Sequence, residues 1–282
     1  MAEAREVSVV IPAFDEEEGI GAVVERLARL GFHEVLVVDD GSRDATAERA
    51  ARAGARVVRH PYNKGNGAAV KTGVREAGGG VVLLMDADGQ HDPDEAVALY
   101  GPVGEYDMVI GARRARDQDV VRALGNGLFT LLASWLTGRP IPDLTSGYRA
   151  ARRDRLLDVL HLLPNGFSYP TTSCLAFLKA GWSVSFVPIL ARSRVGKSKI
   201  KVVRDGVRFM LIIFKIVTLY SPLRVFFPIA LVSFAAGAVY GVWNVLHAGK
   251  IPMGAALLIQ LAVVVFLFGL ISEQIAAAQE RR

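Results

Sequence analysis

Short apolar runs separated by amphipathic segments mark about the first 200 residues of the chain. Val81–Met85 contains no polar residue, which is typical of a strand buried on both faces of a sheet. Val35–Val38 has the same character, and Val7–Ile11 is apolar except for Ser8. The alternation of such runs with helical patterns predicts an α/β domain, a parallel sheet with helices on both faces. Further strands are predicted at Arg56–Val58, Met108–Ile110 and Val184–Pro188, and helices from Glu16 to Gly31, at Asp44–Ala53, at Gly65–Ala77, from Asp94 to Tyr100 and at Val121–Leu136.

Polar clusters follow three of these strands. Phe14-Asp15-Glu16 follows the first, Asp39-Asp40 the second, and Asp86-Ala87-Asp88 the central one. Because the carboxyl ends of parallel strands share one edge of the sheet, we expect the clusters to converge on one site. Two carboxylates as close as Asp86 and Asp88 repel each other unless a cation binds between them, and Mg²⁺ or Mn²⁺ suits them. The alternative is an ordinary polar turn after the strand.

The composition changes after about residue 207, where the chain becomes strongly apolar. Val225–Leu246 and Ile251–Ser272 are both long enough to cross a bilayer, which takes about 20 residues, and the short link His247–Lys250 predicts a hairpin. Val207–Tyr220 is apolar but interrupted by two cations, as expected of a helix in the membrane interface. The alternative is a helical hairpin buried inside a soluble protein.

Charge predicts the orientation of this hairpin. Seven cations lie between Arg192 and Arg208, before the first span, and Arg281-Arg282 follow the second. By the positive-inside rule both ends face the cytoplasm, which predicts an integral protein of the inner or plasma membrane with its α/β domain on the cytoplasmic face. We expect an α/β domain at 1–200, a juxtamembrane amphipathic segment at 201–220, two transmembrane helices within 221–276 and a cytoplasmic tail at 277–282.

The overall charge narrows the partners. The net charge of +5 and the pI of about 9.4 favour an anionic partner, either a phosphate ligand or acidic lipid. The cationic stretch carries no interleaved aromatic residues, so we expect no nucleic acid. A single cysteine, Cys174, excludes an internal disulfide framework. The sequence leaves open whether the chain forms a homo-oligomer.

Six motifs occur in a fixed order, PAFDEEEGI, VVDDGSRDAT, NKGNGAAVKTG, MDADGQHDP, IGARR and DLTSGYR. This set resembles the family 2 glycosyltransferases over roughly residues 6 to 200, and within them the polyprenyl-phosphate branch that includes dolichol-phosphate mannose synthase. The resemblance implies the GT-A fold, an α/β domain with a Rossmann-like, mostly parallel sheet. The resemblance implies a nucleotide-sugar donor (a GDP- or UDP-hexose) and a DxD motif that binds Mg²⁺ or Mn²⁺. It also implies inverting transfer to an undecaprenyl or dolichyl phosphate in the membrane, as in cell-envelope glycosylation.

The resemblance also assigns roles by motif position. The metal would bind Asp86 and Asp88, and the segment Asp143–Arg149 would be a polar loop that closes over the sugar and the acceptor phosphate. Gly89 departs from the bulkier residue that many relatives carry. The implied donor contacts are Pro12, Phe14, Glu16, Asp39, Asp40, Lys64, Asp86, Ala87 and Asp88; the catalytic residues are Asp88, Gln90, Arg113 and Arg122; the acceptor-phosphate contacts are Arg113, Arg122, Asn126, Ser146, Lys197 and Lys199.

Simpler interpretations compete with several of these roles. Arg113 and Arg122 could belong to an exposed charged face, and Lys197 and Lys199 could attract anionic lipid without touching the acceptor. A lipid phosphate has a second pKa of roughly 6 and needs no catalytic base. An acceptor hydroxyl on a sugar or glycan would need one, and Asp143 is then the candidate. A membrane-bound scaffold without turnover is a third hypothesis, which the intact Asp-x-Asp pair disfavours.

Overall fold

The computed structural model describes residues 2–89, 91–113, 127, 130, 131, 133–135, 137–166, 168–190 and 222–280. The chain divides into two compact units, Met1–Lys199 and Ile200–Arg282. The interfacial helix predicted at Val207–Tyr220 lies outside the described residues. Of the helix predicted at Val121–Leu136, the described residues from Gly127 to Trp135 are helical.

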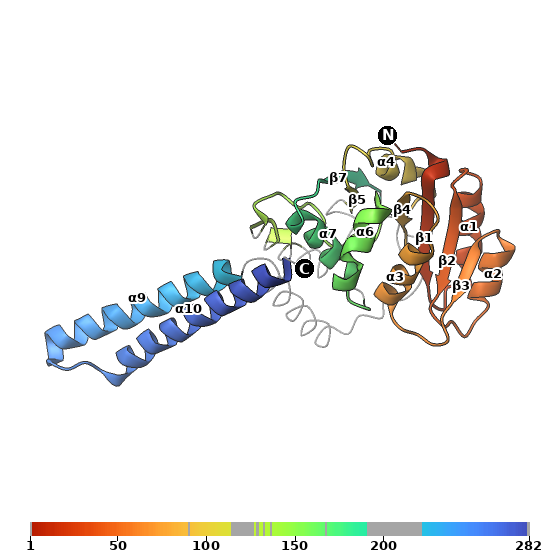
Figure 1. Ribbon diagram of the computed structural model, residues 1–282. Helices are drawn as coiled ribbons and strands as arrows, with labels where there is room; N and C mark the ends of the chain where they lie inside the picture. The colour runs from red at the N-terminus through yellow and green to blue at the C-terminus, as the bar shows by residue number, and fades with distance from the viewer. Residues whose placement is uncertain are drawn as a thin grey trace. The chain divides into compact units, whose positions relative to one another are not determined.

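A seven-stranded sheet lies at the centre of the first unit, in the order β3-β2-β1-β4-β6-β5-β7 (Figure 1). Every pairing is parallel except those of β6, which is antiparallel to both β4 and β5. The predicted mostly parallel sheet is therefore confirmed. The strands are β1 (Val7–Ala13), β2 (Glu34–Asp39), β3 (Arg56–Arg59), β4 (Val81–Leu84), β5 (Met108–Arg113), β6 (Arg149–Arg152) and β7 (Val184–Ile189).

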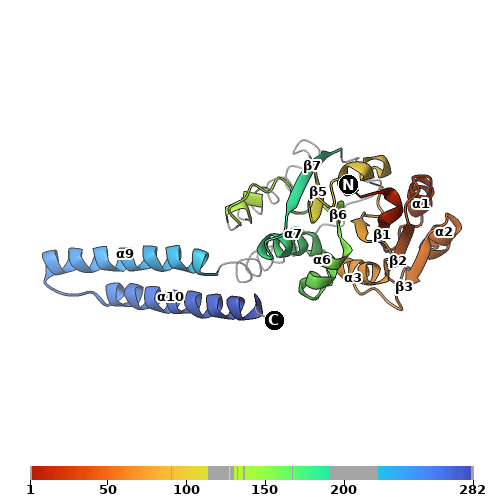
Figure 2. The same cartoon turned by 45° about the horizontal axis from the view of Figure 1, so that its top comes forward.

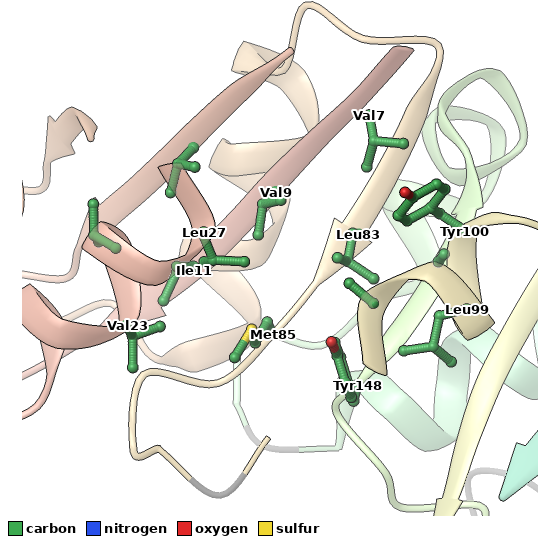
Figure 3. Packing of buried hydrophobic residues seen from close by; sticks show 14 of the residues in the cluster. Val7, Val9, Ile11, Val23, Leu27, Leu83, Met85, Leu99, Tyr100 and Tyr148 are labelled. Carbon is green, nitrogen blue, oxygen red and sulfur yellow. The ribbon is translucent and has the colours of Figure 1, made fainter. Parts of the chain in front are cut away.

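Helices cover both faces of the sheet, as predicted (Figures 1 and 2). On one face α1 and α4 bury an apolar cluster against alternate strand residues such as Val9, Ile11 and Leu83 (Figure 3). On the other face α3 packs so closely that a Cβ at Gly73 would lie 2.2 Å from a methyl group of Val10. The helices are α1 (Ile20–Ala28), α2 (Thr46–Arg52), α3 (Asn66–Glu76), α4 (Ala96–Tyr100), α6 (Arg153–Val159) and α7 (Tyr169–Lys179).

Two local predictions are wrong. The helix predicted from Glu16 begins instead at Ile20, after turns in which the Glu16 carbonyl accepts the N–H groups of Gly19 and Ile20. The predicted polar loop Asp143–Arg149 ends earlier, because Arg149 is the first residue of β6, paired with Leu84 of β4 and Ile110 of β5. The RAAR sequence of β6 has no apolar run, and its burial comes from the two strands that flank it.

The second unit contains two long antiparallel helices, α9 (Pro222–Ala248) and α10 (Met253–Glu280), which lie side by side in both views (Figures 1 and 2). Their apolar windows have mean hydropathies of 2.0 and 2.6, and only 11% and 17% of these windows is buried. Both helices are thus long and apolar enough to cross a membrane, and most of their apolar surface is exposed. The prediction of two apolar spans is confirmed, although α10 continues past the predicted end of its span at residue 276.

Close packing at glycines joins the two helices. A Cβ at Gly237 would lie 3.0 Å from side chains of α10, and one at Gly269 would lie 2.8 Å from Phe226 of α9. Such contacts let helix backbones approach closely in lipid, where van der Waals packing replaces the hydrophobic effect. Four residues after Gly269, the Glu273 carboxylate accepts the backbone N–H of Leu223 at 3.1 Å, which satisfies a donor at the start of α9.

Candidate active site

The loops after β1 and β2 are joined by hydrogen bonds between side chains and backbone. The Asp15 N–H donates to Ser42 Oγ at 3.0 Å, and the Asp15 carboxylate accepts the Arg43 N–H at 2.9 Å. The Glu16 N–H donates to Thr46 Oγ1 at 2.9 Å. Asp15 has a φ of 53°, a left-handed conformation that non-glycine residues seldom adopt. These bonds fix the loop that carries the predicted donor residues; Pro12 is buried, Phe14 is exposed and Glu16 is half-buried.

Asp39, the last residue of β2, is fully buried. Its Oδ1 accepts the Ser42 N–H at 2.9 Å, and the Arg59 Nε lies 3.0 Å from its Oδ2 without hydrogen-bond geometry. Arg59 also donates to the Ser42 carbonyl at 2.9 Å. The predicted nucleoside contact at Asp39 therefore lies beneath a half-exposed arginine at the sheet edge.

The Asp40 carboxylate accepts hydrogen bonds from three groups of the protein. Its carboxylate accepts the N–H groups of Lys64 at 3.0 Å and Gly65 at 2.7 Å, and the Nδ1–H of His60 donates to it at 2.6 Å. The Nε2 of His60 lies 2.9 Å from Thr72 Oγ1 on α3. Asp40 thus holds the loop that carries Lys64. The sequence reasoning missed His60, whose partners are twenty and twelve residues away.

The Asp-x-Asp pair follows β4 at the middle of the sheet edge. Asp86 and Asp88 are half-buried, while Ala87 between them is buried. A Cβ at Gly147 would lie 2.5 Å from Asp86 Oδ2, which shows how closely the 147 backbone approaches that carboxylate. The described residues contain no group of three or more metal-ligating His, Cys, Asp or Glu side chains. Two oxygen ligands on an open edge fit Mg²⁺ or Mn²⁺ that takes its other ligands from phosphate and water.

His91, which the sequence did not predict, contacts the backbone of Asp86. Its Nδ1 accepts the Asp86 N–H at 3.3 Å, and its ring stacks on Tyr148 with the ring centroids 4.8 Å apart. Burial lowers the pKa of His91 to about 4, so the ring is neutral near pH 7, and the nearby Asp88 carboxylate opposes that shift. Tyr148 in turn donates its hydroxyl to the Asp92 carbonyl at 3.0 Å.

Arg113, at the end of β5, forms a bidentate ion pair with Asp143. Its Nε and Nη2 donate to the two carboxylate oxygens at 2.8 and 3.1 Å, and its Nη2 also donates to Thr145 Oγ1 at 2.7 Å. The Asp143 side chain is fully buried and that of Arg113 is 23% exposed. Burial would raise the pKa of Asp143, but the Arg113 guanidinium outweighs it and holds the pKa below its ordinary value. Asp143 is therefore a weak base.

Ser146 and Arg149 lie inside the protein rather than on its surface. Both are fully buried, and the Arg149 guanidinium donates to the Ser146 carbonyl. Burial lowers the pKa of Arg149, and the carboxylates of Asp143 and Asp86 are among the groups that oppose this. The predicted contact between Ser146 and an acceptor phosphate thus concerns a side chain that is covered in this structure.

The structure therefore brings one group of predicted residues together at the middle of the edge. Electrostatic interactions join Arg113 to Asp86 and Asp88, and a Cβ at Gly19, in the loop after β1, would lie 3.5 Å from the Ala87 carbonyl. The predicted roles of Gln90, Arg122, Asn126, Lys197 and Lys199 fall outside the described residues.

A strand-end carboxylate pair on a mixed α/β sheet, with a hairpin of two apolar helices in the same chain, is the arrangement that the sequence motifs predicted for an enzyme of GT-A fold. The family model of Glycosyl transferase family 2 matches residues 8–160, and that of the GtrB C-terminal hairpin matches residues 221–278. The chain belongs to glycosyl transferase family 2 and is a glycosyltransferase.

Two relatives carry names that specify an acceptor. A dolichyl-phosphate hexose transferase of Haloferax volcanii is 33% identical over 69% of this chain and 86% of its own length. An undecaprenyl-phosphate 4-deoxy-4-formamido-L-arabinose transferase of Pectobacterium carotovorum is 33% identical over 56% of this chain. The match spans only 52% of the second relative, about half of its length.

Among solved structures, glucosyl-3-phosphoglycerate synthase from Mycobacterium tuberculosis in complex with Mn²⁺, UDP-glucose and glycerol 3-phosphate is similar to this chain. The TM-score is 0.60 and the identity 26%, over 76% of this chain and 79% of the other. That enzyme binds a divalent metal together with a UDP-sugar, on a fold that this chain shares.

Proposed function

We propose that this glycosyltransferase moves a hexose from a nucleotide sugar to the phosphate of a membrane polyprenyl phosphate, with inversion at the anomeric carbon. The observation that carries the proposal is the union, in one chain, of a family 2 domain and a GtrB-type hairpin of two apolar helices. Polyprenyl phosphates reside in the bilayer, because each buried CH₂ adds roughly 0.8 kcal/mol of membrane affinity. The two relatives named for lipid-phosphate acceptors support the same substrate class.

The donor site would lie at the carboxyl edge of β1, β2 and β4. Asp86 and Asp88 would hold Mg²⁺ or Mn²⁺, which when bound supplies Lewis-acid neutralisation of the leaving diphosphate. Phe14, Glu16 and Asp39 would take the nucleoside. Asp40 would act through the loop it holds, since its carboxylate already accepts bonds from His60, Lys64 and Gly65.

The state of Asp143 favours a phosphate acceptor over a hydroxyl. A hydroxyl acceptor requires a base, and the candidate base is fully buried with its carboxylate bound by Arg113 and by the Thr145 N–H. A lipid phosphate is already anionic at pH 7, since its second pKa is roughly 6. Arg113 keeps a positive charge beside the Asp-x-Asp pair, where it can orient that anion.

The proposal includes an orientation. With both ends of the hairpin in the cytoplasm of an inner or plasma membrane, the catalytic unit meets nucleotide sugars where they are made, and the link between α9 and α10 emerges on the other side. The distribution of Lys and Arg around the two spans supports this arrangement.

The test is transfer to matched lipids. Purified full-length protein is incubated with UDP-glucose, UDP-galactose, UDP-N-acetylglucosamine or GDP-mannose and Mn²⁺, and with either undecaprenyl phosphate or undecaprenol, which differ only in the phosphate. Mass spectrometry should find a hexosyl phosphate lipid with one donor and nothing on undecaprenol. Transfer to undecaprenol, or to 3-phosphoglycerate in place of either lipid, would contradict the proposal.

A further inference from the structure

Arg149 is a fully buried guanidinium whose hydrogen-bond acceptors are all neutral. Its Nη1 donates to the Pro170 carbonyl at 2.6 Å and to Ser173 Oγ at 2.8 Å, both on α7, and its Nη2 donates to the Ser146 carbonyl. Its Nε has no hydrogen-bond partner among the described residues. The described residues include no carboxylate within ion-pair distance of it.

Packing alone does not account for this arrangement. A buried charge that lacks a paired counter-ion is costly to the fold. A methionine would fill the space between β6 and α7 without that cost. The guanidinium differs from it in two ways, in its fork of donors and in its charge.

Both properties act on Asp86. The fork ties the Ser146 carbonyl to α7, and the next residue, Gly147, is the one whose backbone lies against the Asp86 carboxylate. The charge interacts with the carboxylates of Asp143 and Asp86. Arg149 therefore acts on the site through the Ser146–Gly147 backbone and through its positive charge, and it contacts neither carboxylate.

We propose that Arg149 is a positioning residue for the metal-binding carboxylate Asp86, acting through the Ser146–Gly147 backbone. This inference rests on the proposed function, because it assumes that Asp86 binds a divalent metal. Residues that hold metal ligands from behind typically change metal affinity by about 10- to 100-fold when replaced. The same range is expected here.

The experiment measures Mn²⁺ binding to the full-length protein by electron paramagnetic resonance, without and with UDP, beside thermal unfolding. Arg149→Met should bind Mn²⁺ about 10- to 100-fold more weakly, and the loss of affinity should exceed what any fall in melting temperature from the unpaired Ser146 and Pro170 carbonyls explains. Arg149→Lys keeps the charge but cannot reach three acceptors at once, so its affinity should fall between those of wild type and Arg149→Met. Arg153→Met is the matched control, since Arg153 also donates to two carbonyls, of Val74 and Arg75, away from the site.

Two milder variants cover the case in which Arg149 variants do not fold. Ser173→Ala removes one acceptor of the guanidinium, and Thr172→Ala beside it removes a hydroxyl that donates to the carbonyl of Ser168, the N-cap residue of α7. Ser173→Ala should weaken Mn²⁺ binding and Thr172→Ala should not. In Gly147→Ala the added methyl group would press on the Asp86 carboxylate and weaken Mn²⁺ binding. The loss of Mn²⁺ affinity in the double variant with Ser173→Ala should be smaller than the sum of the two single losses, because both changes act on the same backbone segment.

The outcomes separate the inference from the proposed function. Equal Mn²⁺ affinity in wild type, Arg149→Met and Ser173→Ala would overturn the positioning role and leave the proposed function intact. A fall in melting temperature with unchanged Mn²⁺ affinity would likewise assign Arg149 to the fold alone. If wild-type protein with UDP binds no Mn²⁺, the metal site is wrong, and this inference falls with it.

Discussion

The ion pair between Arg113 and Asp143 offers the sharpest division between a phosphate and a hydroxyl acceptor. If the acceptor is a phosphate, Asp143 matters only because it holds Arg113. The change Asp143→Asn removes the charge but keeps the shape and the oxygen that accepts the Thr145 N–H. Asp143→Asn should then reduce turnover no more than Arg113→Gln does, and it should cause no further loss when the two changes are combined.

The magnitude follows from the geometry. Two unit charges 4 Å apart interact by about 4 kcal/mol at an effective dielectric constant of about 20, and breaking a buried pair typically costs about 3–5 kcal/mol. Because the Arg113 side chain is 23% exposed, water recovers part of this loss. We therefore expect Asp143→Asn to lower the free energy of unfolding by about 2–3 kcal/mol. In a unit of about 200 residues, this loss lowers the melting temperature by about 4–12 °C.

Turnover should fall about a hundredfold in Arg113→Gln, the scale for one preorganised charge, and no further in the double variant Arg113→Gln/Asp143→Asn. The assay is initial transfer to undecaprenyl phosphate by the two single variants, the double variant and wild type. Losses that multiply in the double variant would mean that Asp143 acts independently of Arg113, as a base would.

The pH dependence gives a second readout from the same variants. The pKa of Asp143 is lowered, so the stability that this carboxylate contributes is present above its ordinary pKa of 3.8 and is lost only as pH falls through the lowered value. Between about pH 5 and 8 it stays ionised. The rate should rise through roughly pH 6 with the acceptor's second ionisation, in wild type and in Asp143→Asn alike. Disappearance of that rise in the variant would refute the reasoning.

Other changes test the metal, the fold and the orientation. Asp88→Asn should keep the fold yet reduce turnover with Mn²⁺ by at least about a hundredfold in the lipid-product assay, and wild-type turnover would exclude a metal role. Gly65→Ala should lower the melting temperature well beyond Gly54→Ala, because both glycines have φ near 100° but only at Gly65 would a Cβ meet backbone, at 2.4 Å; equal shifts would contradict the packing. An impermeant maleimide applied to intact cells should label Lys250→Cys and not Ala2→Cys, and the reverse pattern would invert the proposed orientation.

The strands with apolar runs could be predicted from the sequence because burial on both faces leaves them almost entirely apolar. Val81–Leu84 and Val7–Ala13 are the clearest cases. Arg149–Arg152 could not be found in this way. Two of its four residues are arginines, and what makes it a strand is the gap between β4 and β5, which only the folded sheet creates.

The same distinction applies to the site. The convergence of Asp39 and Asp86 on one edge follows from the parallel sheet, so motif order alone predicts it. The partners of those residues do not follow, because they depend on side-chain geometry across the fold. His60 on Asp40, His91 on the Asp86 backbone and Asp143 on Arg113 join residues that no periodicity relates.

The antiparallel setting of β6 has a consequence for how this protein can change. The chain leaves the sheet at Arg113 and re-enters it at Arg149 on the same edge, and the ion pair between Arg113 and Asp143 closes the base of that excursion. Both ends of this connection therefore meet at the edge that carries the Asp-x-Asp pair. A replacement between Arg113 and Asp143 that preserves the ion pair and the segment 143–149 should leave the register of β4, β5 and β6 unchanged. A graft of that part of the connection from a relative would test whether it selects the acceptor while the donor residues of β1, β2 and β4 stay intact.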